Sequence, residues 1–151
     1  MKKFIKRKMG SLKVAWQKVL HLNDTPEKVA LGFAVGAFVG VFPTFWLGGL
    51  IIIGLSAVFR LNYVSGLLGS VIIMNPVTTP LFWISSAFLG GLLFPKDAHI
   101  VMEAVRNHTI FNSFGKAALI YITGNGIISV VVSVLSYYVV KFIVKKKRNE
   151  K

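Results

Sequence analysis

Three long stretches without a charged residue constrain this chain more than any other feature of its sequence. They cover residues 29–59, 61–95 and 117–140, which are 31, 35 and 24 residues long. A helix needs about 20 apolar residues to cross the hydrocarbon core of a bilayer, so each stretch is long enough. Only 15% of the 151 residues are charged, against about 25% in soluble domains. The sequence therefore predicts an all-α integral membrane protein.

The net charge of +13 is concentrated at the two ends of the chain. Residues 1–28 carry a net charge of +6 and residues 141–151 one of +5. Basic flanks mark the cytoplasmic side of membrane proteins, so we expect a multi-pass protein of the inner (cytoplasmic) membrane with both termini in the cytoplasm. Because the basic residues do not alternate with aromatic residues on one face, we expect membrane lipids as partners and no nucleic acid.

Prolines interrupt the first two uncharged stretches near their midpoints. Pro43 and Thr44 lie in the first, and the sequence Asn75-Pro76-Val77-Thr78-Thr79-Pro80 lies in the second. Unbroken helices of these lengths would measure about 46 and 52 Å, well beyond a hydrocarbon core of about 30 Å. Proline also removes a backbone donor and disfavours helix in the residue before it. We therefore expect a membrane domain of two Pro-broken helical segments or hairpins, residues 26–59 and 61–95.

The other segments are expected to be helical as well. The expected order is a basic amphipathic interfacial or cytoplasmic segment (1–25), an amphipathic interfacial loop helix (96–116), a C-terminal transmembrane helix (117–144) and a basic cytoplasmic tail (145–151). The alternative is that the transmembrane helix starts only after Gly124-Asn125-Gly126. The N-terminal segment could instead pack on a partner protein. With both basic ends in the cytoplasm the number of full crossings is even, so one of the broken segments is expected to be re-entrant.

Small residues recur every four positions in the first segment. Thr25 is a favourable N-cap and Pro26 suits the first helical position, so we expect the first helix to begin there. Gly32, Gly36 and Gly40 then form a groove along this helix, into which another helix can pack closely. We expect these glycines to be helix-packing residues, with a groove for substrate as the alternative. We also expect a homo-oligomer that forms through the glycine face.

Polar residues and prolines at the two breaks are the candidate substrate-binding residues. They are Pro43, Thr44, Asn75, Pro76, Thr78 and Thr79. A broken membrane helix leaves backbone groups that protein or a water-filled cavity must satisfy, and paired broken helices mark binding sites in transporters. Thr44 and Thr79 are also placed to open the following half-helices, whose N-terminal N–H groups attract anions. The alternative is that these residues only cap the breaks.

Arg60 is the only charged residue between Lys28 and Lys96, and Asn62 lies close to it. A lone arginine near a membrane either extends to the interface or binds an anion, and its guanidinium group suits phosphate. We therefore add Arg60 and Asn62 to the candidate site and leave both interpretations open.

Catalytic and metal chemistry have little support in this sequence. The chain has no cysteine, and its uncharged stretches contain no histidine or aspartate to activate a serine. His99 and Glu103 are four residues apart and His108 follows, but a metal site needs three or four converging ligands. We expect no metal, no cofactor and no enzymatic activity.

Four short motifs resemble those of a bacterial membrane family, the domain of unknown function 2062. They are residues 26–36 (PEKVALGFAVG), 40–43 (GVFP), 59–62 (FRLN) and 75–78 (NPVT). The resemblance covers about residues 25–94. It implies a membrane domain that occurs alone or joined to glycosyltransferase domains, and therefore a connection to envelope glycans or lipid-linked sugars. The resemblance brings no established chemistry with it.

Two functional hypotheses follow. The first is a membrane protein that binds or translocates an anionic lipid or a lipid-linked substrate at the junctions of the broken helices. The second is a non-transporting scaffold or regulator of an envelope glycosyltransferase, which would be its partner.

Overall fold

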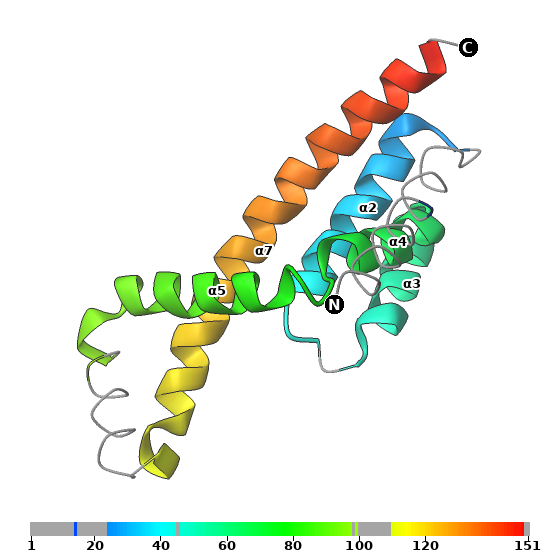
Figure 1. The fold of residues 1–151 in the computed structure, drawn as a ribbon. Coiled ribbons are helices and arrows are strands. Elements are labelled where there is room, and N and C mark those ends of the chain that lie inside the picture. The colour runs from blue at the N-terminus through cyan, green and yellow to red at the C-terminus, as the bar shows by residue number, and fades with distance from the viewer. Residues whose placement is uncertain (1–13, 15–23, 45, 98, 100–109, 150–151) are drawn as a thin grey trace, which may run out of the picture.

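The computed structural model describes residues 14, 24–44, 46–97, 99 and 110–149 (Figure 1). The main helices are α2 (Pro26–Val41), α3 (Gly48–Val58), α4 (Tyr63–Ile73), α5 (Thr79–Leu93) and α7 (Ile110–Asn149). The described residues contain no strand, as expected for an all-α chain. The expected N-terminal helix and most of the expected loop helix over 96–116 lie outside the described residues.

The starts and ends of the first helices follow local backbone chemistry. The Thr25 hydroxyl accepts a hydrogen bond from the Lys28 backbone N–H at 3.3 Å, and Pro26 is the first residue of α2, as the sequence predicts. Helix α2 ends at Val41, two residues before Pro43. Helix α4 ends at Ile73, before Asn75-Pro76. Both expected interruptions are therefore present.

Helix α2 lies at the centre of the bundle, between α4 and α7 (Figure 1). Its glycines Gly32, Gly36 and Gly40 face Asn62, Gly66 and Ser70 in the same order along the chain, so α2 and α4 run parallel. Ala34 and Val41 are bonded to Ser133 and Asn125 respectively, in the reverse order, so α7 runs antiparallel to α2. Helix α3 packs on both α2 and α4.

The glycine face of α2 is covered by α4 of the same chain. A Cβ atom at Gly36 would overlap the carbonyl oxygen of Gly66, and one at Gly32 would overlap the carbonyl oxygen of Asn62. Within this chain the three glycines therefore lie against the backbone of α4. The homo-oligomer stays a prediction, and in this structure α4 occupies the face through which it was expected to form.

The main apolar core lies between α2 and the last turns of α7. Val29, Ala30 and Phe33 of α2 pack against Val140 and Val144 of α7, and all five are at most 2% exposed. The outward faces of the helices are apolar as well, and large side chains such as Leu50, Phe88 and Phe142 are about 70% exposed.

Helix α7 is longer than the sequence predicts. It begins at Ile110 rather than Ala117 and continues through Gly124-Asn125-Gly126 and into the expected tail. Its 40 residues correspond to about 60 Å of helix. Gly124 lies inside the helix, where its missing side chain leaves room for the α5 backbone. The last turn contains Lys146, Lys147 and Arg148, whose positive charges interact favourably with the negative end of the helix dipole.

Helix α5 leaves the bundle and crosses α7 in direct backbone contact (Figure 1). A Cβ atom at Gly90 would overlap the carbonyl oxygen of Ile120, and one at Gly124 would overlap that of Ser86. Beyond the crossing, Asp97 and Lys116 form an ion pair of 3.1 Å.

Candidate functional site

A pocket lies where the first broken segment is interrupted. Its volume is about 300 Å³, and we call it the junction pocket. It is formed by the end of α2, the start of α3 and the second half of α4, and is lined by Val39, Gly40, Thr44, Trp46, Gly48, Gly49, Ile52, Ser70, Val71 and Met74. None of these described lining residues is charged, so any anion bound here would be met by neutral donors.

The start of α3 supplies such donors. Its N-cap residue is Leu47, and no side chain caps the helix. The first N–H groups of a helix have no partner within it, and Gly48 and Gly49, the first two residues of α3, line the pocket. Thr44 is not the cap that the sequence suggests: its hydroxyl donates to the Val39 carbonyl at 3.5 Å.

Trp46 stands out in the connection between α2 and α3. Its φ angle is 74°, in the left-handed region that side chains other than glycine rarely adopt. Its side chain is completely exposed, with a relative exposure of 102%. None of the described residues covers this indole, although it is among the residues that line the junction pocket.

The second break is closed by its own polar groups. The Asn75 side chain accepts from the Val77 N–H at 3.0 Å and donates to the Ile72 carbonyl at 3.1 Å. The hydroxyls of Thr78 and Thr79 donate to the carbonyls of Ile73 and Asn75. Thr78, rather than Thr79, occupies the N-cap position of α5. Pro76 is exposed on the turn. The side-chain polar groups of Asn75, Thr78 and Thr79 therefore bond to backbone atoms of the same turn.

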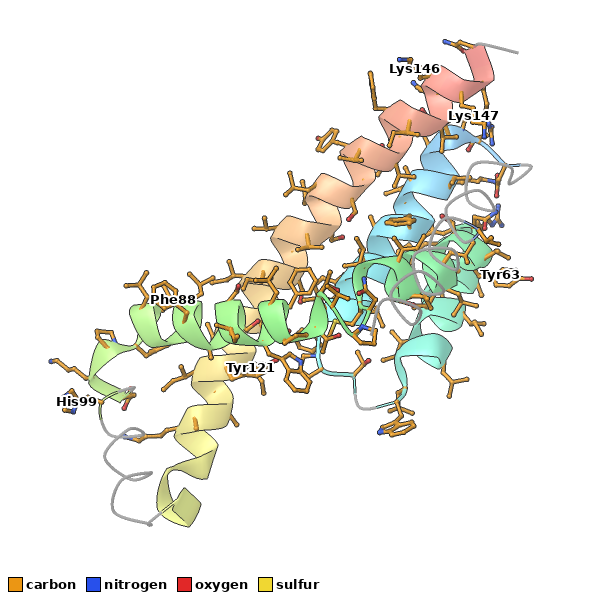
Figure 2. The ribbon with its side chains drawn as sticks, viewed as in Figure 1. Tyr63, Phe88, His99, Tyr121, Lys146 and Lys147 are labelled. Atoms are coloured by element: carbon orange, nitrogen blue, oxygen red, sulfur yellow. The ribbon has the colours of Figure 1, made fainter. Side chains whose placement is uncertain are left out.

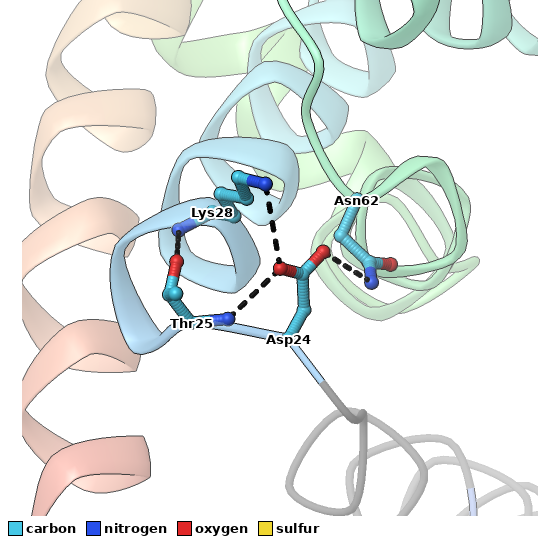
Figure 3. A network of polar contacts seen from close by, with 4 residues as sticks. All are labelled: Asp24, Thr25, Lys28 and Asn62. Atoms are coloured by element: carbon cyan, nitrogen blue, oxygen red, sulfur yellow. Dashed lines mark hydrogen bonds and ion pairs between the residues drawn. The ribbon is translucent and has the colours of Figure 1, made fainter.

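The structure does not bring all predicted site residues together. Asn62 lies at the start of α4, which is 11 residues long and separates it from the second break. The Asn62 side chain caps α4 by accepting from the Ser65 N–H at 2.9 Å, and it donates to Asp24 at 3.3 Å (Figure 3). Arg60 is exposed in the same turn, with a φ angle of 52°. Arg60 and Asn62 therefore belong to the opposite end of α4 from the junction pocket.

The Arg60–Asn62 turn is part of a charged end of the molecule. The Glu27 carboxylate forms ion pairs with the ammonium groups of Lys141 at 3.5 Å and Lys145 at 3.3 Å. The pKa of Glu27 is below its ordinary value, first because of a backbone hydrogen bond to its carboxylate and then because of the bond from Lys145. Lys146 and Lys147 lie at this end, whereas His99 lies at the far end of the molecule (Figure 2). His99 is exposed, and Glu103 and His108 lie outside the described residues.

The sequence did not single out Asn125 or Ser86 as site residues. Asn125 is fully buried and donates to the Val41 carbonyl at 3.2 Å and to the Ser86 hydroxyl at 3.1 Å. Ser86 in turn donates to the Phe82 carbonyl at 2.6 Å. The available signal was a polar amide inside an uncharged stretch, but its two glycine neighbours suggested the start of a helix instead of its interior.

Within the described residues, α7 is the one helix that is long and apolar enough to cross a membrane, over Gly115–Asn149. The apolar helices α3, α4 and α5 are shorter, at 11, 11 and 15 residues.

Comparison with protein families gave one match. The matching family is described as an uncharacterized protein conserved in bacteria (DUF2062), and the match covers residues 10–151. Neither the curated proteins nor the solved structures yielded a match. Since the family match extends over nearly the whole length, including α7 and the basic end, this chain belongs to the DUF2062 family of bacterial proteins.

Proposed function

We propose that this chain is a multi-pass membrane protein that binds an anionic lipid or a lipid-linked substrate in the junction pocket. The exposed apolar faces support the membrane location. Only 22% of the most apolar stretch of Gly115–Asn149 is buried inside the protein, whereas the core helix of a soluble protein is mostly buried. Val131, Leu135 and Phe142 are more than half exposed on this helix, and lipid is the environment in which such a surface is stable.

The contact between Asp24 and Asn62 supports a re-entrant hairpin of α2 and α3. Asp24 precedes α2 and Asn62 follows α3, and their side chains are 3.3 Å apart. The first broken segment thus begins and ends at the same end of the bundle. Residues 61–95 and α7 then make two full crossings, which brings both basic ends to the cytoplasmic side.

The observation that carries ligand binding is the junction pocket beside an uncapped helix start. In hydrocarbon, unpaired backbone N–H groups are tolerated only where protein, water or a ligand satisfies them. The N–H groups of Gly48 and Gly49 lie at the positive end of α3, which favours an anion. At Gly49 the absence of a side chain leaves room for a ligand oxygen beside the backbone, since the nearest atom to a Cβ there is 4.0 Å away, whereas at Gly48 the Thr44 hydroxyl takes that place.

The surroundings of the pocket fit an amphiphilic ligand. Trp46 and Val71 line the pocket and are also exposed on its outer side, at 102% and 57%. An acyl or polyprenyl chain would lie along them while its phosphate meets the α3 start. The 16 residues of α2 measure about 24 Å, so the pocket lies toward the outer leaflet when the basic end is cytoplasmic.

A scaffold that does not bind substrate is the second candidate, and the second break favours it. The polar groups of Asn75, Thr78 and Thr79 bond to backbone carbonyls at that break. Such bonds are typical of capping residues and not of residues that bind a ligand. In this alternative the basic end, with Lys146 and Lys147, contacts a cytoplasmic glycosyltransferase, the kind of partner that the family resemblance implies.

A thermal-shift experiment tests lipid binding. Protein in a neutral detergent receives either phosphatidylglycerol or phosphatidylcholine, and we expect phosphatidylglycerol to raise Tm more. Gly49→Leu adds a side chain at the lining of the pocket, where the nearest atom to a Cβ is 4.0 Å away, and it should abolish the difference. Gly54→Leu is the matched control in the same helix, with nothing within 4 Å, and should keep it.

Equal shifts by both lipids, or an undiminished difference in Gly49→Leu, would overturn the proposal. The scaffold alternative makes a separate prediction for cells that lack the gene. A Gly49→Leu protein should then restore the wild-type phenotype, whereas a chain without residues 1–22 should not.

A further inference from the structure

We infer that Asn125 is a positioning residue of the junction pocket: from α7 it holds the end of α2, which forms one wall of the pocket. This inference rests on the proposed function, because it concerns the same pocket. It adds a residue that lies on another helix and does not line the pocket itself.

The Asn125 side chain connects three helices. Its Nδ2 atom donates to the Val41 carbonyl of α2 at 3.2 Å and to the Ser86 hydroxyl of α5 at 3.1 Å. Its Oδ1 atom accepts from the Ser129 hydroxyl at 3.3 Å. The residue is 0% exposed, so water does not compete for these bonds. Both amide hydrogens are therefore used to join α7 to its two neighbours.

The bond to Val41 matters because of where α2 ends. The last carbonyls of a helix have no N–H partner within the helix and need one elsewhere. Val41 is the last residue of α2, and its carbonyl takes the amide of Asn125. Val39 and Gly40, immediately before it, line the junction pocket. Without the donor, the last turn of α2 is free to unwind, and the pocket wall moves with it.

Ser70 reports on the position of that wall. It lies on α4 and lines the pocket, and a Cβ atom at Gly40 would be 3.2 Å from the Ser70 Cβ. Any movement of the α2 end away from α4 therefore uncovers the Ser70 side chain. The natural chain has no cysteine, so Ser70→Cys introduces one nearly isosteric thiol as the only labelling site.

Ser133 provides the matched control. It also lies on α7 and donates to an α2 carbonyl, that of Ala34, at 2.9 Å. Ala34 is seven residues before the end of α2 and is not part of the pocket wall. Loss of the Ser133 bond thus weakens the same helix pair without releasing the end of α2.

The experiment measures the rate at which N-ethylmaleimide labels Ser70→Cys in native membranes. Only the thiolate reacts, so the rate follows access of water to the pocket. Adding Asn125→Leu should raise the rate about fivefold, the factor by which one lost buried hydrogen bond shifts an opening equilibrium. Adding Ser133→Ala should leave the rate unchanged. A cysteine at Val58, which is 74% exposed at the other end of α3, should react equally in all backgrounds.

Equal labelling of Ser70→Cys with and without Asn125→Leu would overturn the inference, as would an equal rise with Ser133→Ala. If Asn125→Leu does not accumulate, Asn125→Ser is the second variant, because it retains a hydroxyl for its neighbours but is shorter than the amide. The measurement needs no ligand. A failure of lipid to shift Tm therefore refutes the proposed function alone, and unchanged labelling refutes the role of Asn125 alone.

Discussion

Gly36 of α2 and Gly66 of α4 are in backbone contact, so closely that a Cβ atom on Gly36 would overlap the carbonyl oxygen of Gly66. This contact brings the two parallel helices together. Helix α3 packs on both of them, and all three helices line the junction pocket. The contact between Gly36 and Gly66 also explains why the glycine groove of α2 is an internal surface.

The first prediction concerns this contact. Gly36→Ala should destabilise the protein by about 1–3 kcal/mol, because the backbone of α4 has to move away. Gly54→Ala is the control, since a Cβ there has nothing within 4 Å. It should stabilise by about 0.5–1 kcal/mol through the better helix propensity of alanine. Unfolding in detergent followed by circular dichroism measures both, and equal effects would contradict the packing described.

The second prediction concerns the tie between Asp24 and Asn62. Asn62→Ala should cost about 1 kcal/mol, because it removes the cap of α4. A double-mutant cycle with Asp24→Ala separates the cap from the contact between the two side chains, for which we expect a coupling of about 0.5–1.5 kcal/mol. Strict additivity of the two substitutions would show that Asp24 does not hold the ends of the hairpin together.

The third prediction is a pH dependence at the charged end. The pKa of Glu27 is lowered in the folded protein from its ordinary value of 4.5. Its contribution to stability is therefore fully present above that value and is lost as the pH falls from it through the lower, folded pKa. Stability of the wild type should decrease over this range more than that of Glu27→Gln. Parallel curves for the two proteins would show that ionisation of Glu27 does not stabilise the folded protein.

The fourth prediction concerns the strained backbone of Trp46. Trp46→Gly should stabilise the protein by about 1 kcal/mol, because glycine adopts a positive φ without the clash of a Cβ atom. Leu47→Gly, at the next residue, should destabilise by about 0.5–1 kcal/mol, since Leu47 has a right-handed helical backbone. If Trp46→Gly is less stable than the wild type, the indole makes a stabilising contact.

The places where helices start and stop were readable from the chain because they depend on neighbouring residues. Thr25 and Pro26 begin α2, and Pro43 and Asn75-Pro76 follow the ends of α2 and α4. The same local reasoning failed at Gly124-Asn125-Gly126, where α7 continues. Glycine weakens an isolated helix, but here the close approach of α5 uses the missing side chain of Gly124.

The sequence by itself determined an all-helical chain with apolar stretches, basic ends and two interruptions, because charge, hydrophobicity and proline act through the local chain. The tertiary structure alone decided which groups meet. The glycine face of α2 packs against α4, and Arg60 and Asn62 lie at the opposite end from the junction pocket. From α7, Asn125 donates a hydrogen bond to the last carbonyl of α2. Side-chain spacing defines the face on which a residue lies, whereas its partner depends on how the helices pack.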